Sequence, residues 1–425
     1  MDHTVAESTM QALIPGKCVD LYYPDPETAE KQCFRTSLNT KYTQQFANLT
    51  GGTSVFTISP ANGIQDIVLT FQMSNLSGAN TGLALPTAWA YALIKQVSYR
   101  VGGSSQYFIT GSQMLQAALK NAPDGASRQA LYNLGGQQLT GANFDTAGAF
   151  NYGYAWLNLP WTKPASVSKM PPLPTDLLTQ QVQITVELFP IASIFTTTVG
   201  GSPAPTGLLS AQFQVQQIAF ENRGDALANR IDMTTHSLSY PCEFVQQELA
   251  IPVANTAGVQ QVSLTGFRSG EVKSIQCWLT VNGDMAGSSL VTRNPLNWYQ
   301  PNDIVMNYMG DQYAVFPAQS SLLWNLVNGR VIPTVSCPLI APGGAPGANG
   351  AAWAELPFGQ SFDTLTDHTM YVSGKEILNG IVQLQFNLGA DILSNINLST
   401  GVTLHVSYIY NSVLVFSSGT ADFAF

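Results

Sequence analysis

The sequence predicts an all-β protein made of two tandem β-sandwiches, and three observations support this fold class. First, apolar and polar residues alternate with period two, most clearly at 182–188, 382–388 and 402–410, as in strands with one buried face. Second, helical periodicity is scarce and is limited to residues 112–120 and 126–134. Third, 425 residues with 45% apolar side chains exceed one ordinary core. Many strands without long helices favour sandwiches or barrels over a parallel sheet.

The strands follow one another in two groups, separated by turns rich in Gly, Pro, Asn and Ser. In each strand the alternating apolar residues would line one face of a sheet. The predicted strands are residues 54–58, 64–73, 93–101, 182–188 and 208–220 in the first half and 259–264, 272–281, 382–388 and 402–415 in the second. Long stretches between them, such as the Gly/Ala/Pro-rich residues 339–362, are predicted to be loops that form contact surfaces.

A faint internal repeat suggests that the two groups are copies of one unit. Residues 94–103 resemble residues 272–283, since each segment is a strand with an early lysine (Lys95 and Lys273), a later aromatic residue and a terminal Gly turn. Each half also ends with two strands around a Gly-containing loop. Shared β-strand composition is the competing explanation for so weak a likeness.

The repeat divides the chain into four predicted parts. Residues 46–222 would form the first sandwich, residues 240–425 the second, and the polar residues 223–239 the link between them. Residues 1–45 lack a clean strand pattern and carry three prolines, so they are predicted to be an arm that docks on another part of the assembly.

The charge content limits the kind of partner. Only 10% of the residues are charged, against about 25% in an ordinary soluble domain, and 17 Lys and Arg against 26 Asp and Glu give a net charge of −9. So few cations cannot neutralise many phosphates, which argues against direct nucleic-acid binding. The surface is therefore expected to carry uncharged polar residues or to be buried by partners.

Cysteine usage and hydropathy suggest a reducing compartment. The cysteines are odd in number, widely spaced and without a Cys-x-x-Cys pair, which disfavours a disulfide scaffold; they are Cys18, Cys33, Cys242, Cys277 and Cys337. Asp2 and Glu7 stand where a signal peptide needs cations, and no apolar segment reaches the length of a signal core or a membrane span. We therefore expect a protein made in a cytosol and not secreted.

The sequence offers no catalytic, cofactor-binding or metal-binding site. Its four histidines, His3, His236, His368 and His405, have no metal-ligand spacing, and His405 is expected on the polar side of a strand. Carboxylates for a glycosidase exist but cannot be placed together; the candidates are Asp66, Asp232, Asp363 and Asp367. Asp363 and Asp367 with His368 form the one acid–base group worth testing, and a solvated loop is its simpler interpretation.

The tryptophans suggest a binding function instead of a catalytic one, because flat aromatic rings bind sugars and also anchor protein interfaces. They are spread through both halves, at Trp89, Trp156, Trp161, Trp278, Trp298, Trp324 and Trp353. Most are expected to be core or loop anchors.

Three stretches resemble the double jelly-roll major capsid proteins of tailless membrane-containing phages, adenoviruses and large nucleocytoplasmic DNA viruses. Residues 54–62 are similar to a first strand that breaks at a proline, here Pro60. Residues 64–73 and 93–103 are followed by 107–119, which resembles the helix-bearing loop of the first roll in that family. Residues 178–189 resemble a late strand of a roll. The resemblance covers about residues 46–425 as an architecture, without a specific motif.

This resemblance implies two tandem eight-stranded antiparallel jelly rolls with long loops and a few short helices. It implies a homotrimer whose six rolls form a pseudo-hexagonal capsomer of an icosahedral shell around a double-stranded DNA genome. The implied partners are copies of the chain, neighbouring capsomers, penton and minor capsid proteins, and an internal membrane near the N-terminal arm. The implied location is the virion, with no enzymatic activity and no direct contact with nucleic acid.

Two other function classes remain open at this point. A secreted or surface carbohydrate-binding adhesin with paired β-sandwiches would share the low charge and the tryptophans, but it needs an export signal. An enzyme on two jelly rolls, such as a glycan amidase or a copper monooxygenase, would need clustered ligands, and four scattered histidines hardly supply them. The mass in solution separates these classes, because the capsid hypothesis requires a stable trimer.

Overall fold

The structure, a computed structural model, describes most of both halves of the chain. The described residues are 37–73, 83–121, 125–136, 139–140, 151–161, 173–197, 206–220, 238–254, 256, 258–281, 296, 298, 302–316, 353–358, 375–377, 382–388, 401–417 and 419–425. They form five sheets, and every strand pair is antiparallel. None of the helices among these residues is long and apolar enough to span a membrane.

Two four-stranded sheets form the sandwich of the first half. Its strands are β1 (Ser37–Gln45), β2 (Gly52–Thr57), β3 (Gly63–Met73), β5 (Ile94–Arg100), β6 (Tyr107–Ile109), β8 (Tyr152–Trp156), β9 (Gln183–Leu188) and β11 (Leu208–Phe220). Sheet A has the strand order β1-β11-β3-β8, and sheet B has the order β2-β9-β5-β6.

The second half repeats this plan with three additional strands. Its strands are β12 (Leu238–Val245), β13 (Leu249–Val253), β14 (Gly258–Leu264), β15 (Glu271–Val281), β16 (Asn302–Tyr308), β17 (Asp311–Phe316), β18 (Ala354–Pro357), β19 (Lys375–Glu376), β20 (Val382–Leu388), β21 (Val402–Ser417) and β22 (Thr420–Ala424). Sheet D has the order β12-β21-β15-β18, with β13 and β22 on β21 and β19 on β15, and sheet E has the order β14-β20-β16-β17.

The two halves share one topology, strand for strand. Sheet D matches sheet A when β12, β21, β15 and β18 replace β1, β11, β3 and β8, and sheet E matches sheet B when β14, β20, β16 and β17 replace β2, β9, β5 and β6. In both halves the equivalent strands also follow the same order along the chain. Eight strands in two such sheets are a jelly roll, so the chain consists of a first roll and a second roll.

Period-two alternation explains how each roll closes its core. In β3, Ile67, Leu69 and Phe71 are fully buried while the residues between them face outward. The ring of Phe56 from the opposite sheet stacks on Phe213 of β11 at 4.3 Å between centroids. Burying an apolar side chain of this size contributes about 1.5–3 kcal/mol, which makes the space between the sheets the main source of stability.

Among the described residues, the α-helices all lie in the first roll. They are α3 (Trp89–Leu93), α4 (Gly111–Asn121) and α5 (Gly125–Leu134), and the short sheet C joins β10 (Thr196–Thr197), β4 (Leu83–Leu85) and β7 (Leu139–Thr140). The first residue of α4, Gly111, has to be a glycine, because a Cβ there would lie 2.2 Å from the carbonyl oxygen of Tyr91. A glycine thus lets α4 approach α3 closely.

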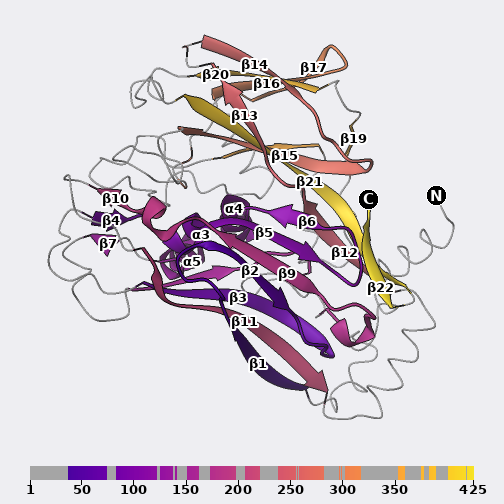
Figure 1. The fold of residues 1–425 in the computed structure, drawn as a ribbon. Coiled ribbons are helices and arrows are strands. Elements are labelled where there is room, and N and C mark those ends of the chain that lie inside the picture. The colour runs from indigo at the N-terminus through magenta and orange to yellow at the C-terminus, as the bar shows by residue number, and fades with distance from the viewer. Residues whose placement is uncertain are drawn as a thin grey trace.

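The four large sheets are stacked in the order E, D, B and A (Figure 1). Helix α4 and strand β6 of the first roll lie next to sheet D of the second roll, so the rolls meet there (Figure 1). Sheets A and E lie at opposite ends of the stack. The junction between the rolls is therefore the place where residues far apart in sequence come together.

The predicted fold class is confirmed, and most predicted strands occur within one or two residues of their expected bounds. Strand β11 has the bounds expected from the sequence, α4 is one residue longer than expected at each end, and α5 is one residue longer at its start. The internal repeat is real, but its matched segments are wrong. Residues 94–103 contain β5, whose equivalent is β16, whereas residues 272–283 contain β15, whose equivalent is β3. Similar composition in two non-equivalent strands caused this mismatch.

One more expectation needs correction. Residues 37–45 lie inside the segment 1–45 that the sequence assigned to an arm without strands, yet they form β1 and pair with β11 along their whole length. The pattern is hidden because β1 is an edge strand whose inward side carries Tyr42 and Gln44 instead of aliphatic residues. Residues 1–36 and 221–237 lie outside the described residues, so an arm over residues 1–36 and a link over residues 223–237 stay a prediction.

Candidate functional site at the junction of the two rolls

The junction is built on the outer face of sheet D, which is polar and yet buried. Residues of β15 and β21 that face away from the sandwich core are opposite one another in register, as in the pairs Gln276–Ser407 and Thr280–Thr403. Hydroxyl, amide and imidazole groups fill this face, and each residue is at most 8% exposed: Ser274, Gln276, Thr280, Thr403, His405 and Ser407. A polar sheet face of this kind is buried only where a partner supplies hydrogen bonds.

Glu355 of β18 in the second roll accepts hydrogen bonds from Ser274 and Gln276, and the first roll supplies the bond to Ser407 from the start of α4. Thr110 and Gln113 form a capping box: the backbone N–H of Gln113 donates to Thr110 Oγ1 at 3.3 Å, and the backbone N–H of Thr110 donates to Gln113 Oε1 at 3.0 Å. Two helix N-terminal donors are thereby satisfied. The amide nitrogen of Gln113 remains available on the side that faces the second roll.

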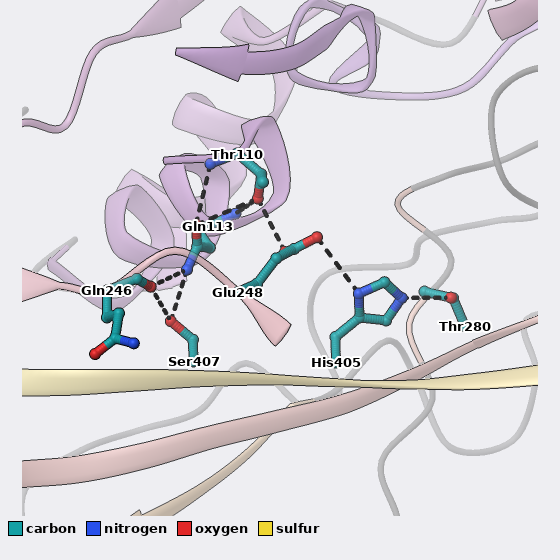
Figure 2. Close-up of polar contacts among 7 residues, drawn as sticks. All are labelled: Thr110, Gln113, Gln246, Glu248, Thr280, His405 and Ser407. Atoms are coloured by element: carbon teal, nitrogen blue, oxygen red, sulfur yellow. Dashed lines mark hydrogen bonds and ion pairs between the residues drawn. The ribbon is translucent and has the colours of Figure 1, made fainter. Parts of the chain in front are cut away.

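This amide crosses the junction (Figure 2). Gln113 Nε2 donates to Ser407 Oγ at 2.6 Å and to the backbone carbonyl oxygen of Gln246 at 2.8 Å. Ser407 Oγ in turn donates to the same carbonyl at 3.2 Å. Gln113 and Ser407 are nearly inaccessible to solvent. One side chain of the first roll therefore satisfies two groups of the second roll in a dry setting.

A second chain of contacts runs beside it (Figure 2). Thr110 Oγ1 donates to Glu248 Oε2 at 3.0 Å, and Glu248 Oε1 lies 3.4 Å from His405 Nδ1. The other ring nitrogen of His405 shares a hydrogen bond of 2.8 Å with Thr280 Oγ1, and its ring stacks on Trp278 with 5.4 Å between centroids. Glu248 can reach both rolls because it follows β12, where the strand breaks before β13 begins.

An aromatic cluster closes the junction at the β6 edge. The ring of Tyr107 contacts Phe244 at 5.1 Å and Phe423 at 5.0 Å between centroids, and its hydroxyl donates to Asp422 Oδ1 at 2.7 Å. The guanidinium of Arg268 lies 5.4 Å from the centre of the same ring. Burial, together with the neighbouring carboxylate of Asp422, raises the pKa of Tyr107 above its usual range. The phenol therefore stays protonated as a donor.

The arrangement holds two rolls together and has the character of an interface. Of the candidates from the sequence, His405 lies in this junction. Asp66 lies elsewhere, on the outer face of sheet A opposite Gln216, where burial raises the pKa of its carboxyl to about 6. The other candidate site residues, His3, His236, His368, Asp232, Asp363 and Asp367, lie outside the described residues. In the described part of the chain, no group of three or more His, Cys, Asp or Glu is placed to hold a metal.

Most of the tryptophans are anchors. Five are at most 2% exposed, namely Trp89, Trp161, Trp278, Trp298 and Trp353, and Trp156 is half-buried. Trp324 lies outside the described residues. Trp278 is part of the junction through its stack on His405.

Sequence reasoning missed Thr110, Gln113 and Glu248. A local signal existed for the first two, because Thr-x-x-Gln before an apolar helical run is a capping box. Their partners in the second roll are 133 and 294 residues away in the chain from Gln113, and no local pattern indicates them.

Several solved structures share this fold over nearly the whole chain. PBCV-1 VP54, a crystal structure fitted into a reconstruction of the virophage Sputnik, is 13% identical, with a TM-score of 0.62 and coverage of 92% of this chain and 97% of that chain. A structure of the Sputnik virophage is 12% identical, with a TM-score of 0.56 and coverage of 91% of this chain and 88% of that chain. The Faustovirus major capsid protein is 12% identical, with a TM-score of 0.52 and coverage of 90% of this chain and 91% of that chain. No family model and no curated protein matches the sequence.

These similarities agree with the topology derived above. Because the match extends over both rolls, it includes their side-by-side placement as well as the strand order within each roll. The chain therefore has the double jelly-roll fold that the sequence resemblance implied. At 12–13% identity the likeness establishes the fold, and function has to be argued from the surfaces of this chain.

Proposed function

We propose that this chain is a viral major capsid protein, and that its homotrimers form pseudo-hexagonal capsomers of an icosahedral shell around a double-stranded DNA genome. The observation that carries this proposal is the duplication: two rolls of identical topology joined through non-equivalent surfaces. The first roll uses α4 and β6, and the second uses Ser407 of sheet D together with strands β12 and β22. A contact between unlike surfaces of like units leads to a ring when repeated with the right rotation.

Three chains would place six such rolls in one ring. A ring with nearly sixfold shape fills a shell of hexagons with one kind of chain, which is an economical use of a duplicated fold. The structural neighbours include the Faustovirus major capsid protein and the PBCV-1 capsid, and this supports the same use here.

The composition supports an assembled surface. With 10% charged residues and a net charge of −9, the chain is suited to neutral contacts with other copies and with neighbouring capsomers rather than with nucleic acid. The further partners of this proposal are penton and minor capsid proteins, and an internal membrane near residues 1–36, which precede β1. The proposed location is the virion after synthesis in a host cytosol, and the proposed role is structural, without enzymatic activity.

The mass in solution tests the proposal. The purified full chain should have about three times the 45.6 kDa of the monomer by native mass spectrometry and by light scattering at micromolar concentration. Negative-stain images should then show particles with a hexagonal outline. A monomer at these concentrations would contradict the proposal, and binding of a monomer to glycans would favour the adhesin class instead.

A further inference from the structure

A buried ion pair crosses sheet D from β15 to β12. Lys273 of β15 contacts the carboxylate of Glu243 of β12, and these two strands lie on opposite sides of β21. Asn411 of β21 is directly opposite Glu243 in register. The residue before Lys273 is opposite Tyr410, the neighbour of Asn411 in β21. An amine, a side-chain amide and a carboxylate therefore lie on three adjacent strands at the same level of the sheet.

A β-bulge directs Lys273 to the outer face of sheet D. The register of β15 against β21 shifts between Val272 and Ser274, which makes Lys273 the extra residue of the strand. Ser274 is on the outer face, where its hydroxyl donates to Glu355 Oε1 at 2.8 Å. In regular alternation the neighbour of Ser274 would point to the core, and a bulge re-aims such a side chain. Lys273 thereby reaches Glu243 across β21.

The amide of Asn411 is on the strand between the two partners of this pair. Residues directly opposite one another in an antiparallel pair point to the same face of a sheet, so Asn411 shares a face with Glu243. Because β21 separates β15 from β12, the lysine side chain has to pass over β21 to make its contact. The register therefore brings the amine to the strand that carries the amide.

The surroundings keep water away from the amine. The side chain of Lys273 is 3% exposed and that of Glu243 is 19% exposed. The backbone N–H of Phe358 donates to the carbonyl oxygen of Lys273 at 3.0 Å and so fixes the bulge. By contrast, the side chains of the Lys95–Glu187 pair are 49% and 37% exposed. A buried lysine beside a carboxylate that accepts its proton is an arrangement in which an amine acts as a nucleophile.

We propose that Lys273 and Asn411 form an intramolecular isopeptide bond, with Glu243 as the acid–base group of the reaction. The structure holds the three groups as they stand before the bond forms, with Lys273 as the cation of the buried pair. The bond joins β15 to β21, which are neighbours in sheet D. The proposal goes beyond the proposed function and does not depend on how many chains assemble.

The reaction exchanges one amide for another and needs no oxidant or reductant. The Glu243 carboxylate accepts a proton from the Lys273 ammonium, and the lone pair of Nζ attacks Cγ of Asn411. A C–N bond forms, and the carbonyl electrons move to Oδ1. Glu243 then gives its proton to Nδ2 and takes up the second proton of Nζ, while the carbonyl re-forms and the bond from Cγ to Nδ2 breaks. The products are a secondary amide, a protonated Glu243 and ammonia.

The mass of the denatured full-length chain tests the proposal. The wild type should be about 17 Da lighter than its sequence requires, because one ammonia is lost. Digestion and fragmentation should place this loss in a branched peptide that joins the segments around Lys273 and Asn411. Linear peptides of full mass for these two segments would overturn the proposal, and so would a loss of ammonia at other residues.

Three variants distinguish the reaction from mere packing. Asn411→Asp should still form the bond but lose water, about 18 Da, because a carboxylic acid condenses with the same amine. Glu243→Gln should keep its full mass, since an amide does not accept the proton of the amine. Glu187→Gln, in the exposed pair, is the matched control and should lose ammonia like the wild type.

Circular dichroism shows which of these variants fold. If Glu243→Gln does not fold, the branched peptide of the wild type and the water loss of Asn411→Asp decide the outcome. A folded Glu243→Gln variant that loses ammonia as fully as the wild type would overturn the role given to Glu243. The mass in solution, which tests the proposed function, is measured separately, so either proposal can fail without the other.

Discussion

The outer faces of sheets A and D occupy equivalent positions in two copies of one fold, and yet one is exposed and the other is buried. On sheet D the polar residues Gln276, Thr280 and Ser407 are each at most 4% exposed. Ser407 bonds to Gln113 of the first roll, whereas Gln276 and Thr280 bond to Glu355 and His405 of the second roll. On sheet A the residues Gln212 and Gln214 keep partial exposure. The comparison teaches that the polarity of a sheet face does not indicate solvent exposure. What decides exposure is whether a partner supplies hydrogen bonds.

The largest difference in the free energy of unfolding is expected between alanine variants of two tyrosines, Tyr107 and Tyr152. Tyr107→Ala should lower the free energy of unfolding by about 3–5 kcal/mol, since it removes a buried ring from between the rolls and leaves Asp422 without its donor. Tyr152→Ala on the outer face of sheet A should change this free energy by no more than about 0.5 kcal/mol. Urea unfolding at a protein concentration where both variants have the same mass measures this. Equal losses would mean that the two faces are not different in coverage.

Two lysine pairs give the next contrast. Lys273 is buried and paired with Glu243, whereas Lys95 and Glu187 form a pair of 2.7 Å whose side chains are 49% and 37% exposed. Lys273→Met should cost about 3 kcal/mol, because a largely buried carboxylate loses its cation, and Lys95→Met should cost at most about 1 kcal/mol. The same unfolding experiment distinguishes them. A small loss for Lys273→Met would show that Glu243 is well solvated.

The glutamine at the junction, Gln113, should contribute more to stability than Gln214 on the outer face of sheet A. Gln113→Ala leaves Ser407 and the carbonyl of Gln246 without their shared donor and should cost about 1–3 kcal/mol. Gln214→Ala should be nearly neutral in the dissociated chain. Hydrogen exchange of the β21 amides should increase in Gln113→Ala and remain unchanged in Gln214→Ala. Unchanged exchange in both variants would argue against the role given to the capping box.

Replacing Asp66 should have the smallest effect on the free energy of unfolding, and this effect should depend most strongly on pH. Because its folded-state pKa is raised to about 6, the folded state binds more protons than the unfolded state between about pH 4 and pH 6. Its contribution to stability therefore falls as the pH rises through this range and stays low above it. Asp66→Asn should stabilise the protein by about 1–2 kcal/mol at pH 7 and by little at pH 4. Thermal melts from pH 4 to pH 8 check this, with Glu187→Gln on the exposed pair as the control.

Much of the fold could be predicted from local periodicity, and the failures have physical reasons. Apolar and polar residues alternate cleanly in strands β20 and β11, because one side of each strand packs on a core. Strand β1 was missed because an edge strand needs few aliphatic residues, and α3 was missed because five residues are too few to show a helical period. The repeat was assigned to non-equivalent strands, since strands with one buried face resemble one another whatever their place in the topology.

The junction could be predicted only in part. The capping box of Thr110 and Gln113 is a local pattern that the sequence contains. Its function comes from Ser407, which β21 brings to α4 through a chain separation of 294 residues. Such a pairing depends on how the two rolls pack together, and composition alone does not indicate it. The neutral composition is in line with the polar outer face of sheet D, which is buried within the chain.

A three-dimensional electron microscopy reconstruction of the purified full-length assembly tests the central claim most directly. The account predicts three chains in one ring, so that six rolls give the particle a hexagonal outline. Particles that contain a single chain, or assemblies whose rolls do not form such a ring, would contradict it.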